Sequence, residues 1–342
     1  MTPAPRVSFL MAVYDGEMYL EEAIQSVLNQ TFPDFEFIVI NDGSIDETSQ
    51  IIERYRQLDG RIRAYEQPNR GLVVALNRGL ELARGEYVAR MDADDISVTE
   101  RTAAQVAFMD AHPEVGICGT WIETFGSGGA VVRRYPTDDA TIRSWLLFES
   151  VLAHPSIMMR RELFVKTDLS YDVGSVHAED YDLWVRAARH MTLANIPEVL
   201  LRYRLHSQQV VQKHEAEKLA SARLVRLAQL EYLGIQPTEE ELALHQALSA
   251  WQFQGTSDFI NASLAWLHKL KSANDVAGIY PEPVLLRVLG QRWFALCARA
   301  TPLGLWTLRT FQRTPLSAGA GLTWMQMLKF AVKCGIRRRV HV

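Results

Sequence analysis

The sequence predicts an α/β fold in which a mostly parallel sheet is flanked by helices, followed by an all-helical C-terminal region. Up to about residue 210, short and nearly continuous apolar runs alternate with segments whose apolar residues recur at helical spacing. This alternation is typical of βαβ units, whose strands are buried on both faces. Beyond that point the apolar period is helical and no strand signal is clear.

The first half of the α/β region contains four expected strands and three expected helices. The apolar run 7–13 ends in a turn at Tyr14-Asp15-Gly16, and the run 35–40 ends at Asn41-Asp42-Gly43-Ser44. Apolar residues at helical spacing mark the helices between the strands. The expected strands are 7–13, 35–40, 61–65 and 87–91, and the expected helices are 17–30, 51–58 and 72–83.

The remainder divides into the end of the α/β domain and the helical region. A glycine cluster at 126–129 marks a hairpin tip; it is too late and too short for a dinucleotide fingerprint, and no GxxxxGK[ST] phosphate loop occurs. We predict domains at 1–210 and 211–342. In the first domain we also expect helices 99–111, 141–148 and 181–189, a hairpin of 116–125 and 131–135, and strands 157–159 and 199–203. In the second domain we expect helices near 213–233, 238–254, 256–271, 282–300 and 323–335.

Composition narrows the class of protein. A chain of 342 residues with 48% hydrophobic and 22% charged residues is typical of globular proteins, which excludes disordered and fibrous classes. Three separated cysteines without a CxxC predict neither a disulfide framework nor a zinc site, and fit a reducing, cytoplasmic setting. No run approaches the roughly 18–20 apolar residues of a spanning helix. An acidic N-terminal region and the lack of a recognisable module argue against nucleic-acid binding.

Three aspartates follow the strand expected at 87–91. Asp92, Asp94 and Asp95 repel one another, and a hard divalent cation held by their oxygens and by substrate phosphates would compensate them. The alternative is a solvated acidic turn before the next helix. Tyr14, Asp42 and Asp92 all stand at strand ends, where ligands bind in parallel sheets, so one pocket can gather them.

Two further carboxylates, Glu179 and Asp180, stand immediately before the helix expected at 181–189. One interpretation is structural, because the free N–H groups and the dipole of a helix start favour negative charge. The other interpretation is a functional role for this pair.

A series of short motifs, which includes the carboxylates just described, extends from residue 7 to about residue 210. They are VSFLMAVY at 7–14 with Glu17, SVLNQTF at 26–32, NDGSID at 41–46, NRGL at 69–72, NRG at 77–79, GEY at 85–87, DADD at 92–95, HPS at 154–156, Glu179-Asp180 with Trp184, and YRLH at 203–206. Together they resemble the family 2 glycosyltransferases, nucleotide-sugar enzymes of the Rossmann-like GT-A fold. The helical region lies outside the resemblance.

The resemblance implies an inverting, metal-dependent transfer of a sugar from a nucleotide diphosphate, UDP being favoured, to a glycan or lipid-linked hydroxyl in cell-envelope or exopolysaccharide synthesis. It implies Asp180 as the base, with Glu179 beside it, and Mg²⁺ or Mn²⁺ as the cofactor. The expected nucleotide contacts are Ala12, Val13, Tyr14, Glu17, Asp42, Arg70, Asn77, Asp92 and Ala93. The expected metal ligands are Asp94, Asp92 and His206; Asp95 and Arg204 would face the donor sugar and diphosphate, and His154 and Trp184 the acceptor.

The tail adds a separate feature, since no Asp or Glu follows Glu282 while basic residues continue to Arg339. Its aromatic residues are Trp293, Phe294, Trp306, Phe311 and Trp324. Either this basic tail contacts the inner membrane leaflet as a peripheral surface, or the aromatics pack a core or an oligomer contact. Two other function classes stay open: a sugar nucleotidyltransferase, and a nucleotide-sugar-binding protein without turnover.

Overall fold

The computed structural model describes residues 4–206 and 215–337 and divides into two compact units. The first unit comprises the described residues up to Ile142 together with those in Ser150–Ala222; the second comprises Arg143–Glu149 and the described residues from Arg223 onward. The domain boundary expected at 210/211 lies outside the described residues.

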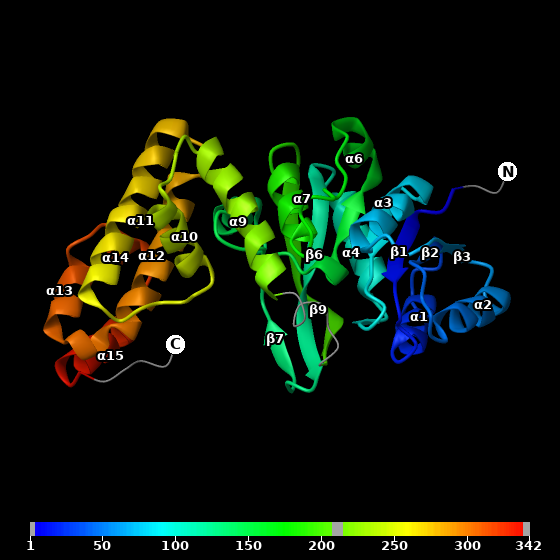
Figure 1. The fold of residues 1–342 in the computed structure, drawn as a ribbon, viewed down its shortest axis with the longest axis horizontal. Helices are drawn as coiled ribbons and strands as arrows, with labels where there is room; N and C mark the ends of the chain where they lie inside the picture. Colours follow the sequence, from blue (N-terminus) through cyan, green and yellow to red (C-terminus); the bar gives the residue numbers. More distant parts are fainter. Residues whose placement is uncertain (1–3, 207–214, 338–342) are drawn as a thin grey trace. The chain divides into compact units, whose positions relative to one another are not determined.

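The first unit is built on a nine-stranded sheet of order β3-β2-β1-β4-β8-β6-β9-β5, with β7 paired to β6 (Figure 1). β1 to β4 are mutually parallel, β8 is antiparallel to β4 and β6, and β9 runs parallel to β6. The strands are β1 (Val7–Val13), β2 (Phe35–Asn41), β3 (Ile62–Glu66), β4 (Tyr87–Arg90), β5 (Ile96–Ser97), β6 (Val115–Gly126), β7 (Val131–Arg133), β8 (Met158–Arg160) and β9 (Thr192–Leu205). The predicted α/β fold with a mostly parallel sheet is confirmed.

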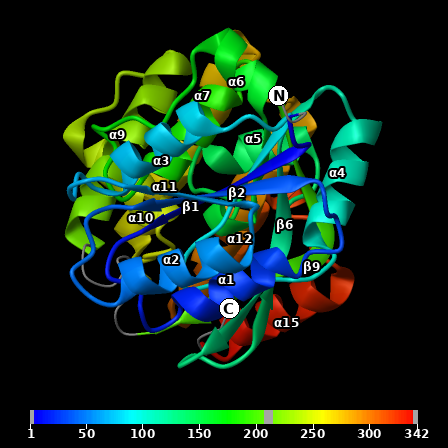
Figure 2. The ribbon, with the colours of Figure 1, turned by 90° about the vertical axis from the view of Figure 1, so that its right-hand side faces the viewer.

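Helices cover both faces of the sheet. Figure 2 shows α1 and α2 on one side of β1 and β2 and α3 on the other. Phe9 and Phe37 share one core with Ile24 of α1 and Ile52 of α2, whereas Leu10 faces α3 at Gly79, where an added Cβ would lie 2.0 Å from Leu10 Cδ1. The helices are α1 (Leu20–Leu28), α2 (Thr48–Leu58), α3 (Leu72–Leu82), α4 (Arg101–Ala111), α5 (Asp139–Leu146), α6 (Arg161–Thr167) and α7 (Glu179–Ala187), and a 3₁₀ turn, η1, spans His154–Ser156.

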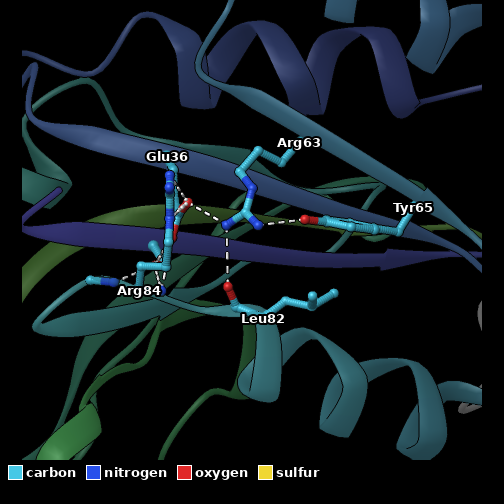
Figure 3. A network of polar contacts seen from close by, with 7 residues as sticks. Glu36, Arg63, Tyr65, Leu82 and Arg84 are labelled. Atoms are coloured by element: carbon cyan, nitrogen blue, oxygen red, sulfur yellow. Dashed lines mark hydrogen bonds and ion pairs between the residues drawn. The ribbon is translucent and has the colours of Figure 1, made fainter. Parts of the chain in front are cut away.

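A buried carboxylate fastens the beginnings of the strands (Figure 3). Glu36 on β2 is 3% exposed and accepts hydrogen bonds from Ser8 Oγ at 2.7 Å, Arg63 NH1 at 2.6 Å and Arg84 Nε at 2.9 Å. Arg63 also donates to the Leu82 carbonyl at the end of α3. This network ties β1, β2 and β3 together at the end of the sheet opposite to their carboxyl ends.

The strand β9 is longer than predicted, because the expected 199–203 forms only its second half. Pro197, which cannot donate a ladder hydrogen bond, interrupts the apolar alternation. The pairing of β6 with β9 shifts register at this point, from Thr120 opposite Ile196 to Trp121 opposite Val199. A strand that continues through such an irregularity has no continuous sequence signal.

The second unit is helical, as predicted, around a core that includes Trp266, Leu289, Trp293, Phe311 and Phe330. Buried Arg292 joins the segment 143–149 to this core through an ion pair with Glu149 at 2.6 Å. No helix among the described residues is long and apolar enough to cross a membrane. The helix α9 begins in the first unit, and the sequence did not predict α13 and α14. The helices are α9 (Glu215–Tyr232), α10 (Glu239–Ser249), α11 (Ser257–Ala277), α12 (Glu282–Arg299), α13 (Leu305–Gln312), α14 (Leu316–Gly319) and α15 (Trp324–Gly335), and a 3₁₀ turn, η2, spans Thr301–Leu303.

Candidate active site

Three neighbouring strands bring their carboxyl ends to one edge of the sheet. β2 and β4 pair with β1 in parallel, with Asn41 opposite Val13 and Arg90 opposite Leu10. The N–H of Asp42 donates to the carbonyl of Val13 at 2.8 Å, and the N–H of Met91 donates to that of Leu10 at 3.0 Å. The segments after β1, β2 and β4 therefore begin side by side, as expected for ligand sites in parallel sheets.

Asp42 anchors the loop that follows β3. Its Oδ1 accepts from Gln67 Nε2 at 2.7 Å and from the N–H of Arg70 at 3.0 Å, and its Oδ2 accepts from the N–H of Gly71 at 2.8 Å. Gly71 has φ +88°, a backbone conformation that glycine adopts readily. A carboxylate offers about four acceptor positions, so these three bonds leave room for about one more. The side chain of Arg70 is exposed.

The turn after β1 is held by the turn after β2. The N–H of Asp15 donates to Ser44 Oγ at 3.0 Å, and the carboxylate of Glu17 accepts the N–H of Glu47 at 2.9 Å. Glu17, expected at the nucleotide, is thus engaged within the protein. The Val13 side chain belongs to the core, Ala12 is half-buried, and the Tyr14 side chain is 49% exposed at this edge.

The three aspartates after β4 form a compact group. One ligand oxygen from each of Asp92, Asp94 and Asp95 lies within 4.8 Å of the other two. Asp92 and Asp94 are partly exposed, but Asp95 is fully buried. Burial raises the pKa of Asp95 well above its usual range, and the charges of Asp92 and Asp94 add to that effect. Oδ2 of Asp95 has no hydrogen-bond partner among the described residues.

Two residues from the end of β9 hold this group in place. Nε2 of His206 lies 2.9 Å from Oδ2 of Asp94. The N–H of Arg204 donates to Asp95 Oδ1 at 2.8 Å, and its Nε donates to the carbonyl of Asp94 at 2.7 Å. The Arg204 guanidinium also pairs with Glu22 and lies over the ring of Tyr19. Arg204, expected at the diphosphate, is therefore committed to supporting the aspartate loop.

Ala93 connects the aspartate loop to the turn after β1. Ala93 packs against the sheet core, and a Cβ added at Gly16 would lie 3.8 Å from the Cβ of Ala93. That same added Cβ would lie 2.5 Å from Val13 Cγ2, so glycine permits the tight turn after β1.

Arg90 was not singled out from the sequence, yet it lies at the centre of the charges. It is the last residue of β4, is 2% exposed and forms an ion pair with Asp92. Its Nε and NH1 have no hydrogen-bond partner among the described residues. Its carbonyl accepts a hydrogen bond at 2.8 Å from Arg101, a second buried arginine. Burial, with the charge of Arg90, lowers the pKa of Arg101 to about 9. An arginine in an otherwise apolar strand was the available sequence signal.

The carboxylates Glu179 and Asp180 begin α7. Glu179 is 7% exposed, and burial followed by the charge of Asp180 raises its pKa to about 7. Burial also raises the pKa of Asp180. The pKa of Asp92 is raised by its burial, with the charges of Asp94 and Asp180 contributing, while Arg90 opposes the shift. The structure thus places the start of α7 within electrostatic reach of the aspartate group.

Two predicted contact residues have structural roles. Trp184, expected at the acceptor, is fully buried, so its ring cannot contact a substrate. Asn77, expected at the nucleotide, donates to the Tyr171 carbonyl at 2.8 Å and accepts the Tyr171 N–H at 2.9 Å. The clamp engages both the nitrogen and the oxygen of the Asn77 amide, and a contact of this side chain with a nucleotide stays a prediction.

His154 lies between these structural residues. Its Nε2 is 2.8 Å from the Tyr171 hydroxyl, and its ring stands edge-on to Trp184 with centroids 5.9 Å apart. Burial, with the charge of Arg90, lowers the pKa of His154 well below its usual value, so the imidazole is neutral. Its contacts are those of an interior packing residue.

A structural comparison shows the same fold in a known protein. The crystal structure of residues 1–349 of S. aureus TarS in complex with UDP-GlcNAc superimposes with a TM-score of 0.59 at 21% identity, over 95% of this chain and 89% of that TarS chain.

Sequence comparisons identify the family. The model of glycosyl transferase family 2 matches residues 8–167. An uncharacterised glycosyltransferase of Haemophilus influenzae is 32% identical over 243 residues, which cover 68% of this chain and 75% of the relative. The O-antigen biosynthesis glycosyltransferase WbnJ of Escherichia coli is 33% identical over 208 residues, which cover 59% of this chain and 80% of WbnJ. The amylovoran biosynthesis glycosyltransferase AmsE of Erwinia amylovora is 31% identical over 208 residues, which cover 59% of this chain and 77% of AmsE. The chain belongs to glycosyltransferase family 2 and is a glycosyltransferase with the GT-A fold.

Proposed function

We propose that the protein transfers a sugar from a UDP-sugar to a hydroxyl group of a glycan or lipid-linked acceptor, with inversion at the anomeric carbon and with a divalent cation. The observation that carries the proposal is the convergence of the aspartate group after β4, the turns after β1 and β2, and the carboxylates that begin α7.

The nucleotide would bind along the turns after β1 and β2. The exposed ring of Tyr14 offers a stacking surface, and the remaining acceptor position of Asp42 matches the N–H of a uracil edge. The backbone of Ala12 and Val13 would border the base. TarS, which shares the fold, was crystallised with UDP-GlcNAc; the preference for UDP in this chain rests on Asp42.

The aspartate group suits a hard cation. Its donors are carboxylate oxygens, the ligands that hard divalent cations prefer, and the buried Oδ2 of Asp95 lacks a hydrogen-bond partner among the described residues. Asp94 and Asp92 would hold Mg²⁺ or Mn²⁺, with His206 beside Asp94. The bound cation would supply positive charge for the diphosphate that leaves. Asp95 would support the donor-sugar side from beneath.

Asp180 would act as the general base. It accepts the proton of the acceptor hydroxyl as that oxygen bonds to the anomeric carbon, while the bond from that carbon to the diphosphate oxygen breaks. Attack from the side opposite the diphosphate inverts the anomeric centre. Glu179, whose pKa is about 7, can stay protonated beside an ionised Asp180, which limits repulsion between them. One positioned base contributes roughly 10²–10⁴-fold to the rate.

The acceptor class follows the relatives that act in O-antigen and amylovoran biosynthesis. A polysaccharide intermediate provides sugar hydroxyls as nucleophiles, and we include lipid-linked glycans in that class. The proposal therefore places the protein in the assembly of cell-envelope or extracellular polysaccharide.

The test measures hydrolysis and transfer with a panel of nucleotide sugars, with and without EDTA. We expect activity with a UDP-sugar that EDTA abolishes, and a loss of at least roughly 10²-fold in both Asp94→Ala and Asp180→Asn. Asp258→Asn, an exposed position on α11, is the matched control and should keep wild-type activity. Full activity in Asp94→Ala or Asp180→Asn would remove the role assigned to that residue. Conversion of a nucleotide sugar and added pyrophosphate to a nucleoside triphosphate and a sugar 1-phosphate, without release of a nucleoside diphosphate, would indicate a nucleotidyltransferase.

A further inference from the structure

The helices α13 and α15 of the second unit present an apolar surface to solvent. The two helices are neighbours (Figure 1). A Cβ added at Gly304, which precedes α13, would lie 3.3 Å from Nε of Arg337, which follows α15. Towards the other end of the pair, the ring centroids of Phe311 and Phe330 are 5.3 Å apart, so the helices are antiparallel. The exposed side chains that define the α13–α15 face are Leu305, Trp306, Trp324, Leu328, Val332 and Ile336.

The pattern of α15 separates a buried side from an exposed one. Phe330 and Cys334 are buried against the helical core. On the outer side, an apolar residue recurs at every fourth position, with Trp324 74% exposed, Leu328 54%, Val332 52% and Ile336 58%. Residues four apart lie on one side of a helix, so they form a continuous stripe. A stripe this exposed lacks a partner within the described chain, and large exposed apolar surfaces mark interaction sites.

The charges around this stripe have one sign. No acidic residue follows Glu282, so neither helix carries one. The exposed basic residues of the two helices are Arg309 and Lys329, with Arg313 and Arg337 just beyond the helix ends. None of them forms an ion pair among the described residues, whereas Lys269 and Lys271 of α11 pair with Glu241 and Asp275. The cations beside the stripe therefore lack a counter-charge on the described surface.

We propose that the α13–α15 face binds the surface of an anionic lipid bilayer. Large apolar and aromatic side chains flanked by unpaired cations fit the boundary between acyl chains and anionic headgroups, where the helix lies in the plane of the membrane. A second copy of the same face would instead oppose two basic, acid-free surfaces, which repel each other. The inference concerns the second unit alone and does not depend on the sugar donor or on metal.

The experiment is co-sedimentation of the full chain with vesicles of phosphatidylcholine alone and with vesicles that also contain phosphatidylglycerol. We expect binding to the anionic vesicles that weakens as salt is raised, because headgroup attraction is screened. Trp324→Ser with Leu328→Ser should lower the partition coefficient by at least about tenfold, since two large apolar side chains no longer enter the interface. Lys329→Glu with Arg309→Glu should also lower the partition coefficient by at least about tenfold, because each substitution replaces a cation with an anion beside the anionic headgroups.

The matched control is Val276→Ser on α11, where valine is 91% exposed away from the stripe. It should bind as the wild type does, and circular dichroism should show unchanged folding for all variants. Equal binding of Trp324→Ser/Leu328→Ser and the wild type, or no binding to anionic vesicles, would overturn the proposal. A dimer in light scattering that the same double substitution dissociates, without vesicle binding, would assign the face to a second copy instead.

Discussion

Replacing Glu179 with glutamine should flatten the pH dependence of the stability of the first unit. Glu179 is nearly fully buried at the start of α7, and burial is the largest cause that raises its pKa from 4.5 to about 7. The charge of Asp180 acts in the same direction, and Asp92 adds to it, while Arg90 opposes both. Glutamine keeps the shape of the side chain and removes its titration.

The direction in which stability changes with pH follows from proton binding. A carboxyl group with a higher pKa in the folded state binds its proton more tightly there, so protonation favours folding. This contribution is fully present below about pH 4.5 and is lost as the pH rises to about 7. A pKa difference of about 2.5 corresponds to about 3.4 kcal/mol, a large part of a typical domain stability of about 5–15 kcal/mol.

The assay is urea unfolding in a chelating buffer at pH values from below 4.5 to above 7. A short proteolytic pulse, with mass spectrometry of peptides from β1 to β4, reports the first unit separately. Between these pH limits the wild type should lose about 3 kcal/mol more than Glu179→Gln, whereas Glu81→Gln, an exposed position on α3, should follow the wild type. A difference below about 1 kcal/mol would refute the reasoning, since it would mean that Glu179 titrates much as it does in an unfolded chain.

Three other changes test separate parts of the structure. Arg90→Met should lower the unfolding free energy by about 3–5 kcal/mol in urea, because it leaves Asp92 without its buried partner; a loss below about 1 kcal/mol would contradict this. Glu36→Gln should lower stability by about 1–3 kcal/mol without changing nucleotide affinity in calorimetry, because Glu36 lies at the far end of the strands; weakened affinity would count against that separation. Asp94→Ala should abolish the thermal stabilisation by Mn²⁺ that Asp258→Asn retains; an undiminished response would exclude Asp94 as a ligand.

The sequence could predict the strand ends because they depend on local pattern. Each apolar run is short and bounded by turn residues, so Tyr14, Asp42 and Asp92 can be placed at one edge without knowledge of any long-range contact. The same reasoning finds the helical second unit. It does not find the first half of β9, where Pro197 breaks the pattern and pairing with β6 compensates through a register shift.

The supporting residues of the site depend on contacts between distant parts of the chain. Asn77 and Tyr171 are 94 residues apart, and His206 and Asp94 are 112 apart. A single sequence gives no information on such pairs, so the engagement of Asn77 by Tyr171 could not be predicted; Arg90 was unusual for an apolar strand, but the sequence did not show its position among the aspartates. Hydrogen bonds to Tyr171 engage Asn77, and burial beside Asp92 sets the role of Arg90; both are properties of the folded chain.

The structural contacts of Asn77, His154 and Trp184 explain how α7 is positioned. Asn77 of α3 holds the backbone of Tyr171, and the Tyr171 hydroxyl meets His154. His154 in turn packs edge-on against Trp184 of α7. These contacts form a continuous, partly buried path from α3 to α7, the helix that begins with Glu179 and Asp180. A base must lie within about 3 Å of the proton it accepts, and a displacement of about 1 Å can cost roughly 10²-fold in rate. We therefore expect the HPS motif and Trp184 to influence catalysis through the location of Asp180, without contacting the acceptor.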